Sequence, residues 1–241
     1  MEWWIVLIIA IASLGVGIAI GIGCFELGQM LYYKKLGATT QVGTIKRGEN
    51  FDKESQLLAE QNADIDTIFV GDSMTEQYDI AKFFKNKNYL NRGIGFNFTL
   101  QVLDRLQPQV LLLKPKRIVL LIGTNDLYFG YRPTQIAEHI QDIIVKAKTT
   151  LPTVKMVIQQ VVPLNESMSP DLNRTNNNIA LVNQLLVNVC KDTDSQLVNS
   201  SKDLIDQNGQ LIKKYTVDGL HLNDDGYQIL TNCLKKNVEN L

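Results

Sequence analysis

From residue 65 onward, short strand-like runs alternate with segments of helical periodicity, and this alternation limits the folds open to the chain. The strand-like runs lie at 65–70, 89–91, 117–122, 154–162 and 196–199. The helical segments lie at 99–113, 133–149, 171–191 and 224–240. Runs that are largely apolar and separated by helices favour a parallel sheet with helices on both faces. The sequence therefore predicts an α/β domain built around a central parallel sheet.

Four short blocks rich in glycine and polar residues lie between these segments. They read Gly71-Asp72-Ser73-Met74, Asn91-Arg92-Gly93-Ile94-Gly95, Gly123-Thr124-Asn125-Asp126 and Asp218-Gly219-Leu220-His221. The first three blocks each come at the end of one of the first three strand-like runs. Because ligand sites of open parallel sheets lie beyond the carboxyl ends of the strands, we expect these three blocks to converge at one edge.

Ser73, Asp218 and His221 form a candidate catalytic set. Ser73 follows a strand in a glycine-led turn, close to a helix N-terminus whose N–H groups favour developing negative charge. Asp218 precedes His221 by three residues, a spacing that lets the carboxylate bind the imidazole Nδ1 and leaves Nε2 for the serine. The other histidine, His139, falls inside a predicted helix, and we interpret it as a surface or packing residue.

The remaining blocks supply candidate donors for an oxyanion hole. These donors are the side-chain amide of Asn125, the backbone N–H of Ser73 and the backbone N–H of Gly95 or Phe96. Taken singly, each block reads equally well as an ordinary turn or helix cap. The four together contain the parts needed to hydrolyse an ester through an acyl-enzyme.

In their order and composition the four blocks resemble those of the GDSL, or SGNH, hydrolase family, over about residues 65–235. The resemblance implies a flavodoxin-like three-layer α/β/α sandwich and ester hydrolysis without a metal or other cofactor. The family often continues its glycine block with a further glycine, where this chain has Phe96. The backbone N–H survives that change, and the ring is expected to crowd or line the acyl pocket.

We therefore expect a serine esterase that acts on short-chain acyl or O-acetyl esters of small molecules, glycans or lipids. A lysophospholipase, thioesterase or acyltransferase would use the same residues, and a non-catalytic, membrane-anchored binding module stays open as well. The formal net charge is −1, from 24 basic and 25 acidic residues, so a nucleic-acid partner is not expected. The sequence predicts no oligomeric state.

Residues 3–25 carry no charge and form the most apolar segment of the chain. As a helix this run would span roughly 34 Å at about 1.5 Å per residue, enough to cross a bilayer core. The basic residues nearest to it, Lys34, Lys35, Lys46 and Arg47, all follow it, which favours a single-pass membrane protein with a cytoplasmic domain. An outward-facing domain, a cleaved signal peptide and a lipoprotein processed at Cys24 are the alternatives.

These observations divide the chain into three parts. Residues 1–33 are predicted to form the transmembrane anchor, and residues 34–62 a linker with a short helix at 53–61. Residues 63–241 are predicted to form the hydrolase domain.

Overall fold

The structure, a computed structural model, describes residues 38–85 and 88–241. The chain divides into two compact units, and the boundary between them in the sequence lies between Lys46 and Arg47. The apolar run at 3–25, predicted to be a membrane anchor, lies outside the described residues. Within the described ranges, no helix is both long and apolar enough to cross a membrane.

In the part of the chain that the structure describes, five parallel strands form one sheet in the order β2-β1-β3-β4-β5. This is the strand order of flavodoxin-type sheets. The strands are β1 (Thr67–Gly71), β2 (Tyr89–Gly93), β3 (Arg117–Leu121), β4 (Lys155–Gln159) and β5 (Gln196–Val198). Gly71 pairs with both Gly93 and Leu121, so the carboxyl ends of β1, β2 and β3 are level. The predicted parallel α/β architecture is confirmed.

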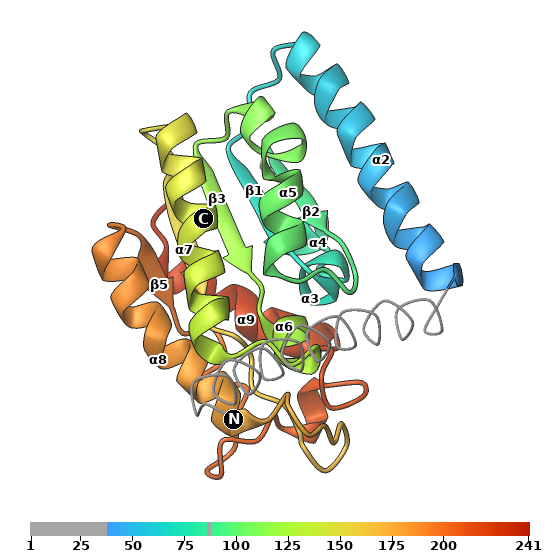
Figure 1. Cartoon of the computed structure of the whole chain (residues 1–241), viewed down its shortest axis with the longest axis vertical. Coiled ribbons are helices and arrows are strands. Elements are labelled where there is room, and N and C mark those ends of the chain that lie inside the picture. Colours follow the sequence, from blue (N-terminus) through green and yellow to red (C-terminus); the bar gives the residue numbers. More distant parts are fainter. Residues whose placement is uncertain (1–37, 86–87) are drawn as a thin grey trace, which may run out of the picture. The chain divides into compact units, whose positions relative to one another are not determined.

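Helices cover both faces of this sheet. The longer ones are α2 (Ala38–Glu60), α5 (Thr99–Gln109), α7 (Pro133–Thr150), α8 (Asn176–Asp192) and α9 (Asp224–Asn237). Because successive strand residues point to opposite faces, Ile68 and Ile118 pack in one buried cluster with α5, α7 and α8. Phe69 and Val119 pack in a second cluster with α9. In Figure 1, α5 and α7 cross in front of the sheet and α9 lies behind it.

Three short helices lie near the site, and of these only the start of the first, next to Ser73, was expected from the sequence. They are α3 (Ser73–Glu76), α4 (Ile80–Phe83) and α6 (Thr124–Tyr128). Each has four or five residues, too few to show a helical period. Two of them, α3 and α6, contain residues of the predicted blocks, so these blocks are helix starts rather than plain turns.

Helix α2 is longer than the short helix predicted at 53–61, and its residues from Arg47 onward belong to the same compact unit as the sheet. Within that unit it buries Phe51 and Ser55, and the Ser55 hydroxyl donates to the carbonyl oxygen of Gln109 at 3.1 Å. The guanidinium of Arg92 lies over the Phe51 ring, 4.6 Å from its centroid. Leu58 and Ala59 of α2 also pack against the core. The polar Ser55 interrupts this face, so α2 shows no continuous apolar stripe from which the packing could be predicted.

Candidate active site

Ser73 stands at the end of β1, as the first residue of α3. The side chain of Asp72 caps this helix and accepts the N–H of Met74 at 2.9 Å. A Cβ at Gly71 would lie 2.2 Å from the carbonyl oxygen of Leu121, so the close approach of β3 requires glycine there. The tight turn leaves Ser73 partly exposed at the carboxyl edge of the sheet, where a ligand is expected.

The structure brings Ser73 and His221 together from opposite ends of the domain. Ser73 Oγ lies 2.9 Å from His221 Nε2, and His221 Nδ1 lies 2.6 Å from Asp218 Oδ2. With the Nδ1 proton directed at the carboxylate, Nε2 is the acceptor for the serine hydroxyl. The predicted set is therefore assembled in the order serine, imidazole, carboxylate.

The loop that holds Asp218 and His221 is fixed mainly by its own hydrogen bonds. Asp218 Oδ1 accepts the N–H of Leu220 at 2.9 Å and that of His221 at 2.7 Å. Gly219 has a φ of +91°, a backbone conformation that favours glycine. Burial by itself raises the pKa of Asp218, but the hydrogen bonds from the His221 ring and from the two N–H groups outweigh it and lower that pKa. Asp218 is thus held in its ionised form beside the imidazole.

Residues 94–97 form a turn beside Ser73. The N–H of Asn97 donates to the carbonyl oxygen of Ile94 at 3.2 Å, and Phe96 at the third position has a φ of +61°. Turns with positive φ at this position favour glycine, which gives a physical reason for the glycine that relatives often carry. The Phe96 side chain is 50% exposed, so its ring borders solvent rather than the core.

Asn125 lies in α6 and is buried, with 5% of its surface exposed. Its amide nitrogen donates one hydrogen bond to the carbonyl oxygen of Asn97 at 2.9 Å. A side-chain amide carries two N–H groups, so one of them holds the Ile94–Asn97 turn and the second is available to a ligand oxygen. Asn125 therefore ties the third block to the second.

Glu76 is a site residue that the sequence reasoning missed. The N–H of Gly95 donates to its carboxylate, and Arg47 of α2 lies 3.6 Å from the same carboxylate. Arg47 also donates to the carbonyl oxygen of Gly93 at 2.8 Å. A candidate oxyanion donor, Gly95, is thus engaged by an internal acceptor in this structure. Glu76 comes three residues after Ser73, but nothing in its local pattern indicates which N–H it will meet.

Two buried carboxylates lie behind the nucleophile. Burial raises the pKa of Asp72 to about 7; the Met74 N–H opposes this shift and the Asp126 carboxylate adds to it. Burial also raises the pKa of Asp126, against hydrogen bonds from Thr99. The Thr99 hydroxyl lies 2.9 Å from Nδ1 of His139, which is partly buried. His139 therefore packs behind the site and does not reach Ser73.

Comparisons with known proteins agree with this geometry. Residues 69–229, which include all four blocks, match the family model of the GDSL-like lipase/acylhydrolase family. No curated protein matches the chain. The chain belongs to the GDSL-like lipase/acylhydrolase family, and carboxylic ester hydrolysis is the activity of this class.

Solved structures from three bacteria share the fold along almost their whole length. One from Streptococcus pneumonia, named for platelet activating factor, is 28% identical with a TM-score of 0.75, covering 86% of this chain and 98% of that one. An acylhydrolase from Bacteroides fragilis NCTC 9343 is 26% identical with a TM-score of 0.66, covering 75% and 93%. A GDSL-like lipase from Bacteroides thetaiotaomicron VPI-5482 is 25% identical with a TM-score of 0.66, covering 77% and 97%.

Proposed function

We propose that this chain is a membrane-anchored serine esterase that hydrolyses short-chain acyl or O-acetyl esters through an acyl-enzyme. The observation that carries the proposal is the pair of hydrogen-bond distances that links Ser73 to His221 and His221 to Asp218, 2.9 and 2.6 Å. In this arrangement the imidazole, oriented by the carboxylate, activates the serine hydroxyl for attack on a carbonyl. The acylhydrolase from Bacteroides fragilis supports the same class of substrate.

In the first half of the reaction, Ser73 Oγ attacks the ester carbonyl carbon while His221 Nε2 takes the hydroxyl proton. The new oxyanion accepts the N–H of Ser73 and the second amide N–H of Asn125. When the intermediate collapses, the bond to the alkoxy oxygen breaks and His221 returns the proton to the leaving alcohol. Asp218 holds the ring in the required tautomer and stabilises its charged form.

In the second half, a water molecule attacks the acyl-enzyme. His221 removes one proton from this water, the oxyanion forms again in the same place, and collapse releases the acid and restores Ser73. A third donor to the oxyanion is the backbone N–H of Gly95 or Phe96. Gly95 can serve only when the Glu76 carboxylate turns away from its N–H, whereas the N–H of Phe96 needs no such movement from Glu76.

The preference for short acyl chains rests on Phe96. Its ring stands on the turn beside the nucleophile, where a glycine would leave open space, and it borders the solvent-facing side of the site. A bulky ring beside the scissile carbonyl limits the length of the acyl group that can be seated there. Acetyl to butyryl esters are the substrates that this arrangement favours.

The membrane anchor is proposed from the sequence. The uncharged run at 3–25 is long enough to cross a bilayer, and the basic residues after it support a cytoplasmic domain. The full chain should resist carbonate extraction from membranes, and the domain should be protected from added protease in intact protoplasts or spheroplasts. Recovery of a mature protein that begins at Cys24 would instead support a processed lipoprotein.

The catalytic part is tested with the full chain in detergent. A fluorophosphonate probe should label Ser73, and a panel of p-nitrophenyl acyl esters and O-acetylated sugars should give the highest kcat/KM for short acyl groups. Absence of both labelling and turnover in the folded protein would favour the non-catalytic binding module.

A further inference from the structure

Arg105 of α5 lies beneath the site, outside the four blocks, with 9% of its surface exposed. Its guanidinium makes three hydrogen bonds. Nε donates to Asn97 Oδ1 at 2.8 Å, Nη1 to Gln109 Oε1 at 3.0 Å, and Nη2 to the carbonyl oxygen of Gly71 at 3.0 Å. None of these acceptors is a carboxylate. A buried cation without a directly paired carboxylate is costly, so these neutral contacts have to provide its stabilisation.

Two of these contacts join the nucleophile block to the turn at 94–97, which continues the glycine block. The carbonyl oxygen of Gly71, just before Asp72 and Ser73, accepts Arg105 Nη2 and also the N–H of Ile94 at 3.1 Å. Asn97, which accepts Arg105 Nε, closes the turn that carries the candidate backbone donors. One planar guanidinium therefore sets the separation between the end of β1 and this turn.

Asn97 also connects Arg105 to Asn125, the side-chain donor of the proposed oxyanion hole. The carbonyl oxygen of Asn97 accepts the Asn125 amide at 2.9 Å, while its side-chain oxygen accepts Arg105. Asn97 is itself 3% exposed, so both contacts are shielded from water. The same turn holds Phe96 with a φ of +61°, which is unfavourable for a residue other than glycine and needs support from its surroundings.

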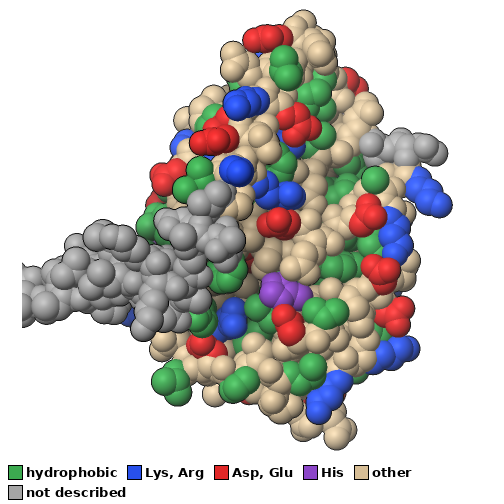
Figure 2. Space-filling view, turned by 90° about the vertical axis from the view of Figure 1, so that its right-hand side faces the viewer, with side chains coloured by type: hydrophobic (Ala, Val, Ile, Leu, Met, Phe, Trp, Pro, Cys, Tyr) green, Lys and Arg blue, Asp and Glu red, His purple; other side chains and the backbone are tan. Residues whose placement is uncertain are grey.

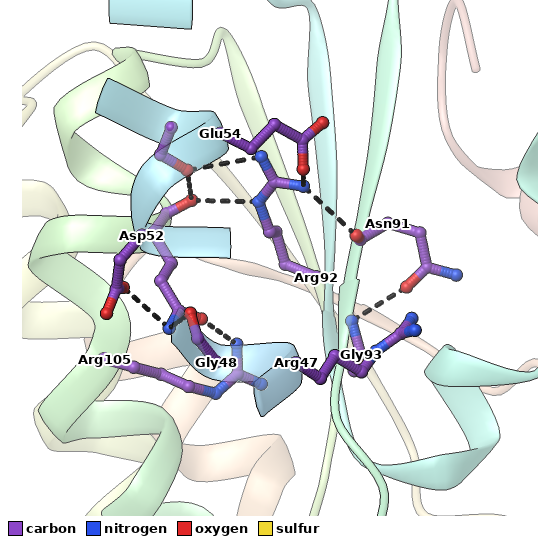
Figure 3. Close-up of polar contacts among 10 residues, drawn as sticks. Arg47, Gly48, Asp52, Glu54, Asn91, Arg92, Gly93 and Arg105 are labelled. Atoms are coloured by element: carbon purple, nitrogen blue, oxygen red, sulfur yellow. Dashed lines mark hydrogen bonds and ion pairs between the residues drawn. The ribbon is translucent and has the colours of Figure 1, made fainter. Parts of the chain in front are cut away.

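A second buried arginine provides a contrast. Arg92 is 2% exposed and donates to Glu54 Oε2 at 3.0 Å and to Ser55 Oγ at 3.2 Å, both in α2. Figure 3 shows Arg92 directed at Glu54, while Arg105 lies apart from that pair on its own helix. Burial lowers the pKa of both guanidinium groups, to about 9 for Arg105, which stays charged at neutral pH. Arg92 thus shares the burial of Arg105 but contacts neither the nucleophile turn nor Asn97.

We infer that Arg105 is a positioning residue for the oxyanion hole. It holds the Gly71 carbonyl and the Asn97 side chain at fixed separation, so that the donors of Ser73, Asn125 and the turn point at one oxygen atom. The inference rests on the proposed function, because an oxyanion hole serves reactions that pass through a tetrahedral acyl intermediate, such as ester hydrolysis. Arg105 would then contribute to ester hydrolysis although it lies outside the four blocks.

The test compares Arg105→Met with Arg92→Met in the full chain, using p-nitrophenyl acetate and a thermal unfolding curve for each variant. Both variants lose a buried cation, and both should lower the Tm. Arg105→Met should also lower kcat, by about 10- to 100-fold with KM little changed and well beyond any loss in Arg92→Met, because sub-ångström misplacement of donors weakens transition-state binding. Arg105→Lys restores the charge but not the planar fork, and should recover only part of the rate.

A double-mutant cycle adds a readout that a purely structural role would not move. Losses of rate from Arg105→Met and Asn125→Ala should be less than additive, since both act on the same oxyanion. Arg92→Met is not used in this cycle, because both arginines bond to Gln109 and their effects are not independent. Equal kcat values for folded Arg105→Met and Arg92→Met, or full additivity with Asn125→Ala, would overturn the inference.

If Arg105→Met does not fold, Asn97→Ala provides the same comparison, because it removes the acceptor of Nε and leaves the cation in place. It should lower kcat in the same sense, and an unchanged kcat would equally overturn the inference. Turnover by the unmodified chain tests the proposed function separately, and without turnover the esterase proposal fails. In that case the rates at which the fluorophosphonate probe labels Ser73 are compared between the two arginine variants.

Discussion

Two aspartates serve the Ser73 site in opposite environments. Asp72 is 1% exposed, and burial raises its pKa to about 7. The side chain of Asp218 is 49% exposed, and hydrogen bonds from its own loop lower its pKa despite partial burial. The first aspartate shapes the turn that presents the nucleophile, and the second orients the base. Residues of one type therefore differ in role because of burial and hydrogen bonding.

The regions in which the two aspartates lie also differ in what holds them together. The buried region comprises the nucleophile turn, the Ile94–Asn97 turn, Arg105 and Asn125, joined by contacts between distant parts of the chain. The loop region, residues 216–222, is held mainly by hydrogen bonds within itself. Changes at the buried side chains of Arg105 and Asn125 should lower both stability and rate, whereas changes at Asp218 should lower the rate alone.

Over the face drawn in Figure 2, acidic, basic and apolar side chains are interspersed, without a patch of one charge.

The largest effect is expected where the two regions meet. Ser73→Ala removes the nucleophile and should lower kcat for p-nitrophenyl acetate by about 10⁴-fold or more, with the Tm almost unchanged. The measurement is steady-state turnover beside a thermal unfolding curve. Near-normal turnover in the folded variant would show that Ser73 is not the nucleophile.

A slightly smaller loss is expected in the loop region. Asp218→Asn should lower kcat by about 10³- to 10⁴-fold, because an asparagine amide that donates to Nδ1 forces the wrong tautomer on His221. The Tm should stay within a degree or two of that of the unmodified chain, since the loop is exposed. Asp224→Asn changes an exposed aspartate at the start of α9, just after the loop, and removes only a surface ion pair with Lys82, so it should change kcat and the Tm little. A large fall in Tm for Asp218→Asn would erase the distinction between the regions.

In the buried region, Asn125→Ala should lower kcat by about 10²- to 10³-fold through loss of one oxyanion donor. It should also lower the Tm, because the carbonyl oxygen of Asn97 loses its amide partner. Asn183→Ala removes another asparagine that bonds to backbone, at Val161, and should lower the Tm without a comparable loss of rate. Equal rates for the two variants would argue against Asn125 as a donor.

Asp72→Asn tests the burial difference through pH. The folded chain holds a proton on Asp72 up to about pH 7, whereas the unfolded chain releases it near 3.8, the ordinary pKa of an aspartate. Stability from this group is therefore full below about pH 4 and is lost as the pH rises through 7. The variant is always neutral and keeps an acceptor for Met74, so it does not lose this stability as the pH rises. The difference between its unfolding free energy and that of the unmodified chain should therefore shift in favour of the variant between about pH 4 and pH 7. The gain should be on the order of a few kcal/mol, at about 1.4 kcal/mol per pKa unit. Parallel curves of stability against pH would contradict the raised pKa.

The smallest effect is expected at Phe96. Phe96→Gly should move the kcat/KM optimum on p-nitrophenyl esters toward longer acyl chains and leave the Tm unchanged or higher, because glycine relieves the positive φ. Phe96→Ala removes the ring but keeps the Cβ, so it should share the change in chain length without the gain in Tm. An unchanged chain-length profile in both variants would show that the ring does not limit the acyl pocket.

Much of the fold and of the catalytic set could be predicted because both depend on patterns between residues close in the sequence. Strands β1 to β5 and helices α5, α7, α8 and α9 lie within a few residues of the predicted segments, since apolar runs and helical periods are short-range signals. The pairing of Asp218 with His221 needs only a three-residue spacing. The convergence of Ser73 and Asn125 follows from the rule that parallel strands present their carboxyl ends at one edge.

Tertiary structure alone decided how these parts are held. Arg105 lies on the buried face of α5, where an apolar residue is expected, and neither Glu76 nor residues 47–58 of α2 belong to a block. Their polar partners come mostly from segments distant in the sequence. Only the folded chain shows that the Gly95 N–H meets a carboxylate and that Phe96 adopts a positive φ. The physical reason is that hydrophobic periodicity records which residues are buried, whereas a buried polar contact is specified by the geometry of two segments that meet only after folding.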